Sequence, residues 1–190
     1  FFKAGYTVPK YMLDLHGTSV FAHALGTFAQ LFAVEPFLII CRDVYGTPDF
    51  VRAQCAALGL PAASLTLVVL DDDTGGQAET VALGLRHAGV TGDTPITIFN
   101  IDTFRPGFAH PVTFDIGAVY GYLEVFHALG EHWSFVRALE NTDRVIEVAE
   151  KRRISDLCSD GLYHFRSAEM FLSLYAMVES IQQREMALKQ

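Results

Sequence analysis

The sequence contains few of the features that identify secreted, zinc-binding or membrane-spanning proteins. Its three cysteines, Cys41, Cys55 and Cys158, are odd in number and widely spaced, so they form neither a CxxC zinc motif nor a disulfide framework. We expect three reduced and mostly packed thiols. No apolar run reaches the roughly 18 residues of a membrane helix, and no segment resembles a secretory signal. These absences predict a soluble, cytoplasmic protein.

Basic residues are also scarce. The chain has 14 Lys and Arg against 22 Asp and Glu, a formal net charge of −8. A nucleic-acid partner would require a basic face, so none is expected. Small phosphorylated ligands remain compatible, because a divalent cation and a few lysines reverse the local charge. None of the seven histidines lies in a triad-like or HExxH context, which disfavours hydrolase and zinc chemistry.

What the chain does contain indicates one folded domain. It has 190 residues, of which 51% are hydrophobic and 12% aromatic, enough to bury a substantial core. Apolar runs that suit buried strands alternate with amphipathic segments that suit helices. The expected strands are 35–43, 64–73 and 95–102, and the expected helices 18–32, 47–59 and 75–89. This alternation predicts βαβ units, a parallel sheet and an α/β fold.

After residue 110 the pattern changes to short strands joined by short loops, which predicts a mixed or antiparallel region. These strands are expected in 116–125, 133–140, 144–151 and 160–165. Residues 167–189 carry apolar side chains at helical spacing. We expect a packed C-terminal helix, with an interface to a second copy as the alternative.

The segment PITIFNIDTF, residues 95–104, places polar side chains where a buried strand ends. Asn100 and Asp102 follow the apolar run directly. A carboxylate at the edge of a core is costly unless a charged or hydrogen-bonding group meets it. Ligands of open α/β sheets bind outside the carboxyl ends of the strands. Asp102 is therefore a candidate ligand-binding residue.

Three other clusters have ordinary explanations when each is taken alone. Lys10 follows Pro9 and resembles a solvated surface lysine. In DDDTGGQAET, residues 71–80, paired glycines precede a helix whose N-terminus offers unpaired N–H groups, although an acidic turn explains this segment equally well. Glu150 and Lys151 adjoin each other after a strand, and such pairs are common.

Together and in this order, the clusters resemble the sugar-nucleotide pyrophosphorylases. The resemblance extends from about Phe2 to Phe165 and rests on the segments VPKYML, GGQAET, FNIDTF, WSFV, EVAEKRRIS and GLYHF. These nucleotidyltransferases join a nucleoside triphosphate to a sugar 1-phosphate, giving a nucleoside-diphosphate sugar and pyrophosphate. The resemblance implies a Rossmann-like mixed sheet, mainly parallel and flanked by helices. It also implies a role in nucleotide-sugar and polysaccharide biosynthesis.

The resemblance assigns roles on the nucleotide side of the site. It implies that Lys10 contacts the triphosphate, that Gly76 and Gln77 contact the nucleobase, and that Asp102 binds Mg²⁺ with Asn100 beside it. These roles suit the chemistry, because attack of one polyanion on another requires positioning and charge neutralisation. Mg²⁺ often takes only one or two protein carboxylates and completes its shell with phosphates and water.

On the acceptor side, the resemblance implies that Glu150 binds sugar hydroxyls, that Lys151 binds the phosphate and that Gly161 lines the same pocket. Two family features have no match: a strand and a Gly-rich, Arg-containing loop before the PK motif, and a second metal-binding aspartate. We therefore expect residues 1–190 to be one nucleotidyltransferase domain whose native chain carries further N-terminal and C-terminal segments.

Other functions remain open at the level of sequence. One is a non-catalytic domain that senses or binds nucleotide sugars. Another is cytidylyl transfer to phosphocholine or a similar small phosphate. A third is glycosyl transfer with Asp71, Asp72 and Asp73 as metal ligands, although these residues are expected to be solvated turn carboxylates. His132, beside Trp133, is a further candidate for contact with a sugar or base.

Overall fold

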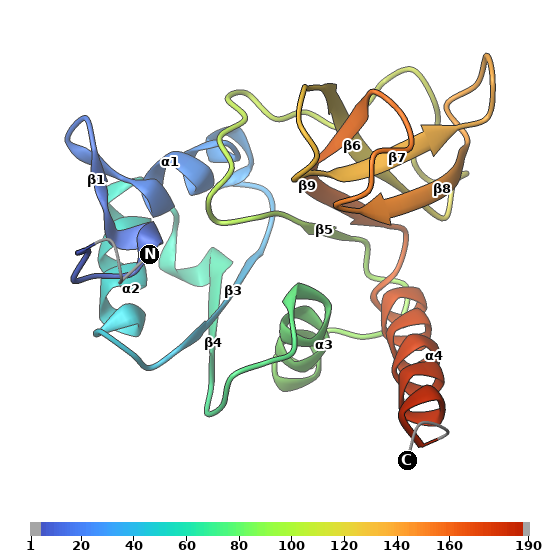
Figure 1. Ribbon diagram of the computed structural model, residues 1–190. Coiled ribbons are helices and arrows are strands. Elements are labelled where there is room, and N and C mark those ends of the chain that lie inside the picture. Colours follow the sequence, from blue (N-terminus) through green and yellow to red (C-terminus); the bar gives the residue numbers. More distant parts are fainter. Residues whose placement is uncertain (1–4, 188–190) are drawn as a thin grey trace.

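The computed structural model describes residues 5–187 (Figure 1). In its N-terminal half, strands β3 and β4 pair in parallel and helix α2 connects them. A short hairpin and helix α1 precede this unit. The bounds are β1 Asp14–Leu15, β2 Thr18–Ser19, α1 Val20–Gly26, β3 Phe37–Arg42, α2 Thr47–Ala57 and β4 Leu65–Leu70, with 3₁₀ turns at Lys10–Met12, Ala29–Leu31 and Ala62–Ser64.

The local sequence explains where these helices begin. Ser19 is the N-cap of α1, and its hydroxyl accepts a hydrogen bond from the amide of Ala22 at 3.1 Å. Pro48 lies in the first turn of α2, where its missing N–H costs nothing. Phe21 of α1 and Val51 of α2 are each 2% exposed and belong to one core cluster beneath β3 and β4.

The C-terminal half forms a five-stranded antiparallel sheet. Its order is β5-β9-β7-β8, and β6 also pairs with β9. The strands are β5 Ile96–Ile98, β6 Gly121–His127, β7 Ser134–Ala138, β8 Val145–Glu150 and β9 Leu157–Phe165. Helix α3, Gln77–His87, leads from the first half into β5, and helix α4, Ala168–Ala187, follows β9 (Figure 1).

Helix α3 links the two sheets. Gly84 lies so close to Ile40 of β3 that a Cβ atom there would be 2.1 Å from the Ile40 side chain. Leu38 of β3 and Ile96 and Ile98 of β5 pack against the same cluster, which contains Leu85 of α3. Helix α3 therefore packs against both sheets. Among residues 5–187, β3 pairs only with β4 and β5 pairs only with β9.

The predicted α/β class, with a mixed set of strands flanked by helices, is confirmed. The predicted predominance of parallel pairing is wrong for residues 5–187, where only β3 and β4 pair in parallel. Two features account for this: β5, three residues long, pairs with β9 instead of β3 or β4, and strands β6 to β9 pair antiparallel among themselves. The arrangement of the described strands is accordingly not clearly Rossmann-like.

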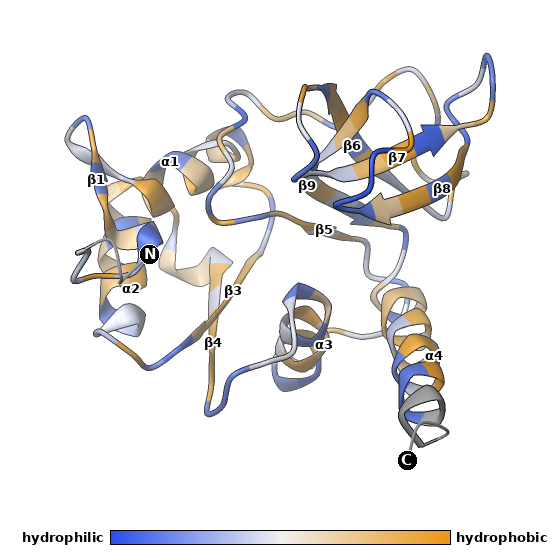
Figure 2. Cartoon of the chain, in the orientation of Figure 1, coloured by the Kyte–Doolittle hydropathy of each residue, from blue (hydrophilic) through white to orange (hydrophobic). Residues whose placement is uncertain are grey.

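The predicted C-terminal helix is confirmed as α4, and its first turns pack on the sheet. Ala168 and Phe171 are buried in the cluster that includes α3. Further along, an apolar stripe remains exposed, formed by Leu174, Met177, Val178 and Ile181 (Figure 2). An interface with a second copy on this stripe stays a prediction. Within the described part of the chain, no helix combines the length and apolarity needed to cross a bilayer.

A polar cluster around the buried His164 joins β5, β6 and β9. His164 is 5% exposed, its Nδ1 lies 3.0 Å from the hydroxyl of Thr97, and its ring stacks on Tyr122 at 4.9 Å between centroids. Nδ1 of His110 lies 2.7 Å from the hydroxyl of Tyr122. Burial raises the pKa of Tyr122 to about 12, with the Glu124 carboxylate adding to the shift. Burial, and then the nearby His110, lowers the pKa of His164 below 6.5.

Because its folded-state pKa is lowered, His164 makes stability depend on pH. Stability is complete above the unfolded-state pKa and is lost as the pH falls through the folded-state value, since the unfolded chain then binds the extra proton. We expect the free energy of unfolding to fall between about pH 7.5 and about pH 5, and His164→Gln to reduce that fall. Urea unfolding at the two pH values measures both. An equal fall in the variant would show that other groups cause it.

Candidate active site at the carboxyl end of strand β5

The residues that follow β5 approach the N-terminal segment. Lys10, in the first 3₁₀ turn, places its Nζ 2.7 Å from Oδ2 of Asp102. The Lys10 and Asp102 side chains are 60% and 40% exposed. An ion pair so open to water contributes at most about 1 kcal/mol to stability. Folding stability alone therefore does not account for this pairing, and each partner is accessible to a ligand of opposite charge.

A second contact joins helix α3 to the same strand end. The Gln77 side-chain amide donates to Oδ1 of Asn100 at 2.7 Å. Gly76 is the N-cap of α3, and the Glu79 carboxylate accepts a hydrogen bond from the amide of Gly75. The N-terminus of α3 and the end of β5 thus present a continuous polar surface that begins two residues from Asp102.

Gly161 completes this surface from strand β9. It is buried, its φ is +90°, and a Cβ atom there would lie 1.9 Å from Nδ2 of Asn100. Only glycine meets both conditions, because the left-handed region disfavours side chains and the Asn100 amide fills the space that a side chain would need. The close approach of Gly161 and Asn100 is therefore built into the backbone.

The Glu150–Lys151 pair lies at the end of β8. Ser134 of β7 faces Glu150 in the strand register, and its hydroxyl donates to Oε2 of Glu150. Nζ of Lys151 lies 3.3 Å from Oε1 of the same carboxylate. The hydrogen bond from Ser134, followed by that from Lys151, lowers the pKa of Glu150. Lys151 itself adopts φ +51°, an unusual value for a residue other than glycine.

Strand register relates the residues that follow β5 to the Ser134–Glu150 pair of β7 and β8. Ile98 pairs with Tyr163, so Asn100 extends β5 toward Gly161. Phe135 pairs with Cys158, so Ser134 lies opposite Ser159 on β9. Because β6 pairs with β9 at both of its ends, β5 and β7 share the other side of β9, and β8 lies beyond β7. The register thus brings the residues after β5 and the start of β7 toward nearby positions of β9, while Lys10 and Gln77 contact the residues after β5.

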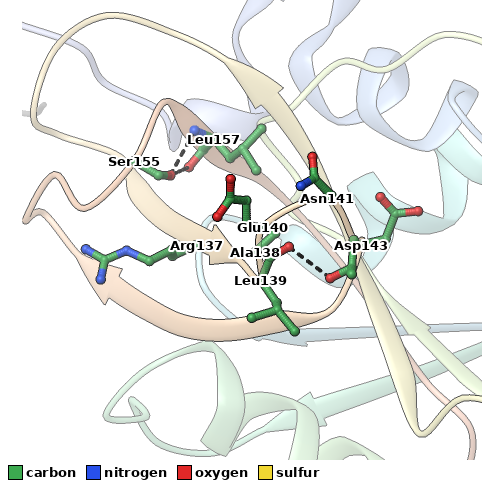
Figure 3. Close-up of a pocket in the computed structure, with 9 residues that line it drawn as sticks. Arg137, Ala138, Leu139, Glu140, Asn141, Asp143, Ser155 and Leu157 are labelled. Atoms are coloured by element: carbon green, nitrogen blue, oxygen red, sulfur yellow. Dashed lines mark hydrogen bonds between the residues drawn. The ribbon is translucent and has the colours of Figure 1, made fainter.

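A cavity lies elsewhere in the C-terminal half. It measures about 530 Å³ and surrounds the turn between β7 and β8, where Arg137, Asn141, Asp143 and Ser155 line it (Figure 3). This turn is at the opposite end of β7 from Ser134. A second cavity of about 500 Å³ lies beside α4, along Thr91, Gly92 and Glu169 among others. Neither of these two cavities includes a candidate site residue.

The remaining candidates occupy ordinary surface positions. Asp71, Asp72 and Asp73 are exposed, and Asp73 pairs with Arg42, as expected of carboxylates in a turn. His132 is exposed, and its ring lies 4.9 Å from that of Trp133. The three cysteines are free, with Cys55 and Cys158 buried and Cys41 half-buried, as the sequence predicts.

A comparison with solved structures identifies the family. The crystal structure of the nucleoside-diphosphate-sugar pyrophosphorylase from Vibrio cholerae RC9 matches 93% of this chain and 72% of its own chain, with 48% identity and a TM-score of 0.84. The chain belongs to the nucleoside-diphosphate-sugar pyrophosphorylase family. This confirms the resemblance inferred from the sequence segments and the fold of a nucleotidyltransferase.

A more distant structure agrees with the family in fold. A Bacillus anthracis protein assigned as a glucose-1-phosphate thymidylyltransferase, crystallised in complex with sucrose, matches 85% of this chain and 64% of its own, at 17% identity and a TM-score of 0.64. No protein-family model matches the chain, and neither does any curated protein.

Sequence reasoning missed several polar residues of this family member's candidate site. Ser134 and Tyr163 lie within the segments WSFV and GLYHF, but their contacts, and those of Ser159, became visible only through strand register and hydrogen bonding. The bond between Gln77 and Asn100 joins residues 23 positions apart. Glu79 had one available signal, since a glutamate in the first turn of a helix suits the positive end of the helix dipole.

Proposed function

We propose that the protein is a magnesium-dependent nucleotidyltransferase that joins a nucleoside triphosphate to a sugar 1-phosphate and releases pyrophosphate. The observation that supports this proposal most directly is the Lys10–Asp102 pair at the carboxyl end of β5, within a chain of the pyrophosphorylase family. In this proposal the pair is assembled in advance of ligand binding. Lys10 exchanges its carboxylate partner for phosphate oxygens, and Asp102 exchanges its ammonium partner for a metal ion.

The donor set fits a magnesium ion that arrives with its nucleotide. Among residues 5–187, no group of three or more His, Cys, Asp or Glu side chains is arranged to hold a metal. Mg²⁺ is often bound by one or two carboxylates, with substrate phosphates and water as its other ligands. Asp102 offers one accessible carboxylate, whose Oδ2 is the oxygen that Lys10 contacts. When bound, the ion would supply charge neutralisation at the triphosphate.

The protein side chains position the two reactants. A phosphate oxygen of the sugar 1-phosphate attacks the α-phosphorus of the nucleotide, the bond from the α-phosphorus to the bridging oxygen breaks, and pyrophosphate leaves. We assign the nucleobase to Gly76, Gln77 and Asn100 at the start of α3 and the end of β5. We assign the sugar phosphate to the edge formed by Glu150, Lys151 and Gly161.

A pyrophosphate-release assay tests this proposal. The full-length protein is incubated with Mg²⁺, each common nucleoside triphosphate and a panel of sugar 1-phosphates, with phosphocholine included. Release that requires both a triphosphate and a sugar 1-phosphate is expected. Release with phosphocholine alone among the acceptors would instead support cytidylyl-type transfer to a small phosphate. Calorimetric binding of a nucleotide sugar without release under any condition would support a non-catalytic binding domain.

Lys151 provides a prediction that separates function from folding. Its left-handed backbone costs roughly 1–2 kcal/mol more than the same conformation in glycine. After allowance for the greater flexibility of unfolded glycine, Lys151→Gly should raise the free energy of unfolding by about 0.5–1 kcal/mol. The loss of the ammonium group should raise the KM for sugar 1-phosphate at least about tenfold, since a charged hydrogen bond to phosphate is lost.

Urea unfolding and steady-state kinetics measure the two effects. His16→Gly is the matched control, because His16 has a similar φ of +56° in the β1–β2 turn. This control should gain stability without a change in KM. An unchanged KM in Lys151→Gly would remove Lys151 from the acceptor site.

A further inference from the structure

The end of β8 is held in place from β7. The amide of Lys151 donates to the carbonyl of Trp133 at 2.9 Å, which continues the ladder one step beyond the register pair of Ser134 and Glu150. Lys151 nevertheless has a left-handed backbone. Such conformations persist where surrounding contacts fix them, and they cluster at functional sites. The left-handed backbone of Lys151 is therefore consistent with a functional role for the contacts around Glu150.

Ser134 fixes one oxygen of the Glu150 carboxylate. Its hydroxyl donates to Oε2, while Nζ of Lys151 lies near Oε1 at 3.3 Å. Ser134 itself is half-buried, but the Glu150 side chain is 64% exposed. A glutamate in water samples several rotamers, and two donors on different sides reduce that freedom. The carboxylate is thus oriented yet remains accessible to a ligand.

Hydroxyl groups continue from Ser134 toward the nucleotide side. Ser159, opposite Ser134 in the register, is 8% exposed, and its hydroxyl donates to the hydroxyl of Tyr163 at 3.3 Å. The same Ser159 oxygen accepts the amide of Gly161 at 3.2 Å. Because cross-strand partners project from the same face of a sheet, Glu150, Ser134 and Ser159 line one face. Hydroxyl groups both donate and accept, which suits a ligand with several hydroxyl groups of its own.

We infer that Ser134 is a positioning residue of the acceptor site, whose hydroxyl holds the Glu150 carboxylate in the orientation that accepts hydrogen bonds from the hydroxyl groups of a sugar phosphate. This inference rests on the proposed function. It adds a residue that the family resemblance did not assign, and it places the hydroxyl-bearing end of the acceptor over β7 and β8. The phosphate of the acceptor stays with Lys151, whose Nζ lies beside the other oxygen of Glu150 at 3.3 Å.

Kinetics of Ser134→Ala test the inference with the full-length protein and the sugar 1-phosphate that gives the highest kcat/KM. The variant should raise the KM for that sugar 1-phosphate about tenfold. The KM for the triphosphate and kcat should stay within about twofold. Ser134→Thr retains a hydroxyl and should recover most of the lost affinity.

The pH profile gives a readout that a purely structural role would not change. Ser134 is the main cause of the lowered pKa of Glu150. In Ser134→Ala that pKa rises toward its ordinary value, so the acid limb of kcat/KM for the acceptor should move to higher pH. An unmoved acid limb together with an unchanged KM would overturn the inference. An equal rise in the KM values of both substrates would do so as well.

Ser155→Ala is the matched control on the same sheet. The Ser155 hydroxyl donates to the carbonyl of Val136 in the middle of β7. This variant should lower the free energy of unfolding without altering the KM for the sugar phosphate. A similar rise of that KM in Ser155→Ala would assign the Ser134 effect to a general loosening of β7 and contradict the inference.

Direct binding distinguishes failure of the inference from failure of the proposed function. If the wild-type protein releases no pyrophosphate, the proposed reaction is wrong, but titration of glucose 1-phosphate and galactose 1-phosphate by calorimetry still tests Ser134. A dissociation constant about tenfold higher in Ser134→Ala supports the inference. Equal dissociation constants, or no binding of either compound to the wild type, overturn it.

Discussion

Asp102→Asn lowers kcat about 100-fold to 1000-fold if Asp102 carries the role proposed here. The substitution retains shape and hydrogen-bonding capacity but removes the negative charge that attracts the metal ion. It also removes the ionic partner of Lys10, whose Nζ lies 2.7 Å from Oδ2. Folding should change little, because an exposed ion pair contributes at most about 1 kcal/mol. Pyrophosphate release at saturating substrates measures kcat, and urea unfolding checks the fold.

Asp73→Asn is the matched control for this prediction. Asp73 is also an exposed carboxylate with a basic partner, Arg42, and it follows the end of β4. Its substitution should leave kcat within about twofold. The opposite result would be a large loss of kcat in Asp73→Asn and no loss of kcat in Asp102→Asn. It would favour metal binding by the turn of Asp71 to Asp73 and glycosyl transfer from a nucleotide sugar.

Gly161→Ala should disturb both folding and activity. The new Cβ atom would lie 1.9 Å from Nδ2 and 2.6 Å from Cγ of Asn100, and the φ of +90° is unfavourable for alanine. Backbone strain and overpacking together predict a loss of about 2–4 kcal/mol in the free energy of unfolding. Asn100 must also move away from Gln77, so kcat/KM for the nucleotide should fall about 100-fold.

Gly107→Ala is the control that measures how much stability is lost through backbone strain alone. Gly107 has a φ of +70°, but a Cβ atom added there would have no atom of residues 5–187 within 4 Å beyond its own chain neighbours. Its substitution should cost about 1–2 kcal/mol through strain alone and leave kcat/KM unchanged. Equal losses of stability and activity in the two variants would show that contact with Asn100 is irrelevant to the site.

Hydrophobic periodicity was sufficient to predict the individual elements. The runs at 35–43 and 64–73 became β3 and β4, and the segments at 47–59 and 75–89 became α2 and α3, with no end displaced by more than three residues. The helix expected at 18–32 ended earlier, since α1 stops at Gly26 and a 3₁₀ turn follows at Ala29–Leu31. Each prediction depended on contacts within a few residues, which local sequence specifies.

Strand pairing was predicted less well because it depends on distant contacts. Strand β5 has only three residues, so few backbone groups identify its partner. That partner is β9, which lies more than 60 positions further along the chain. Lys10 and Asp102 were both identified through motifs, and the structure brings them together. Ser134 lies within the segment WSFV, but it received no role, because its significance depends on the register that places it opposite Glu150.

A crystal structure with a nucleoside triphosphate and Mg²⁺ tests the central claim most directly. We predict an ion about 2.1 Å from a carboxylate oxygen of Asp102, coordinated also by phosphate oxygens. Lys10 should have turned from Asp102 to the triphosphate, with the base against Gln77. An ion bound at the turn of Asp71 to Asp73, with Lys10 and Asp102 still paired to each other and no nucleotide beside them, would contradict the account.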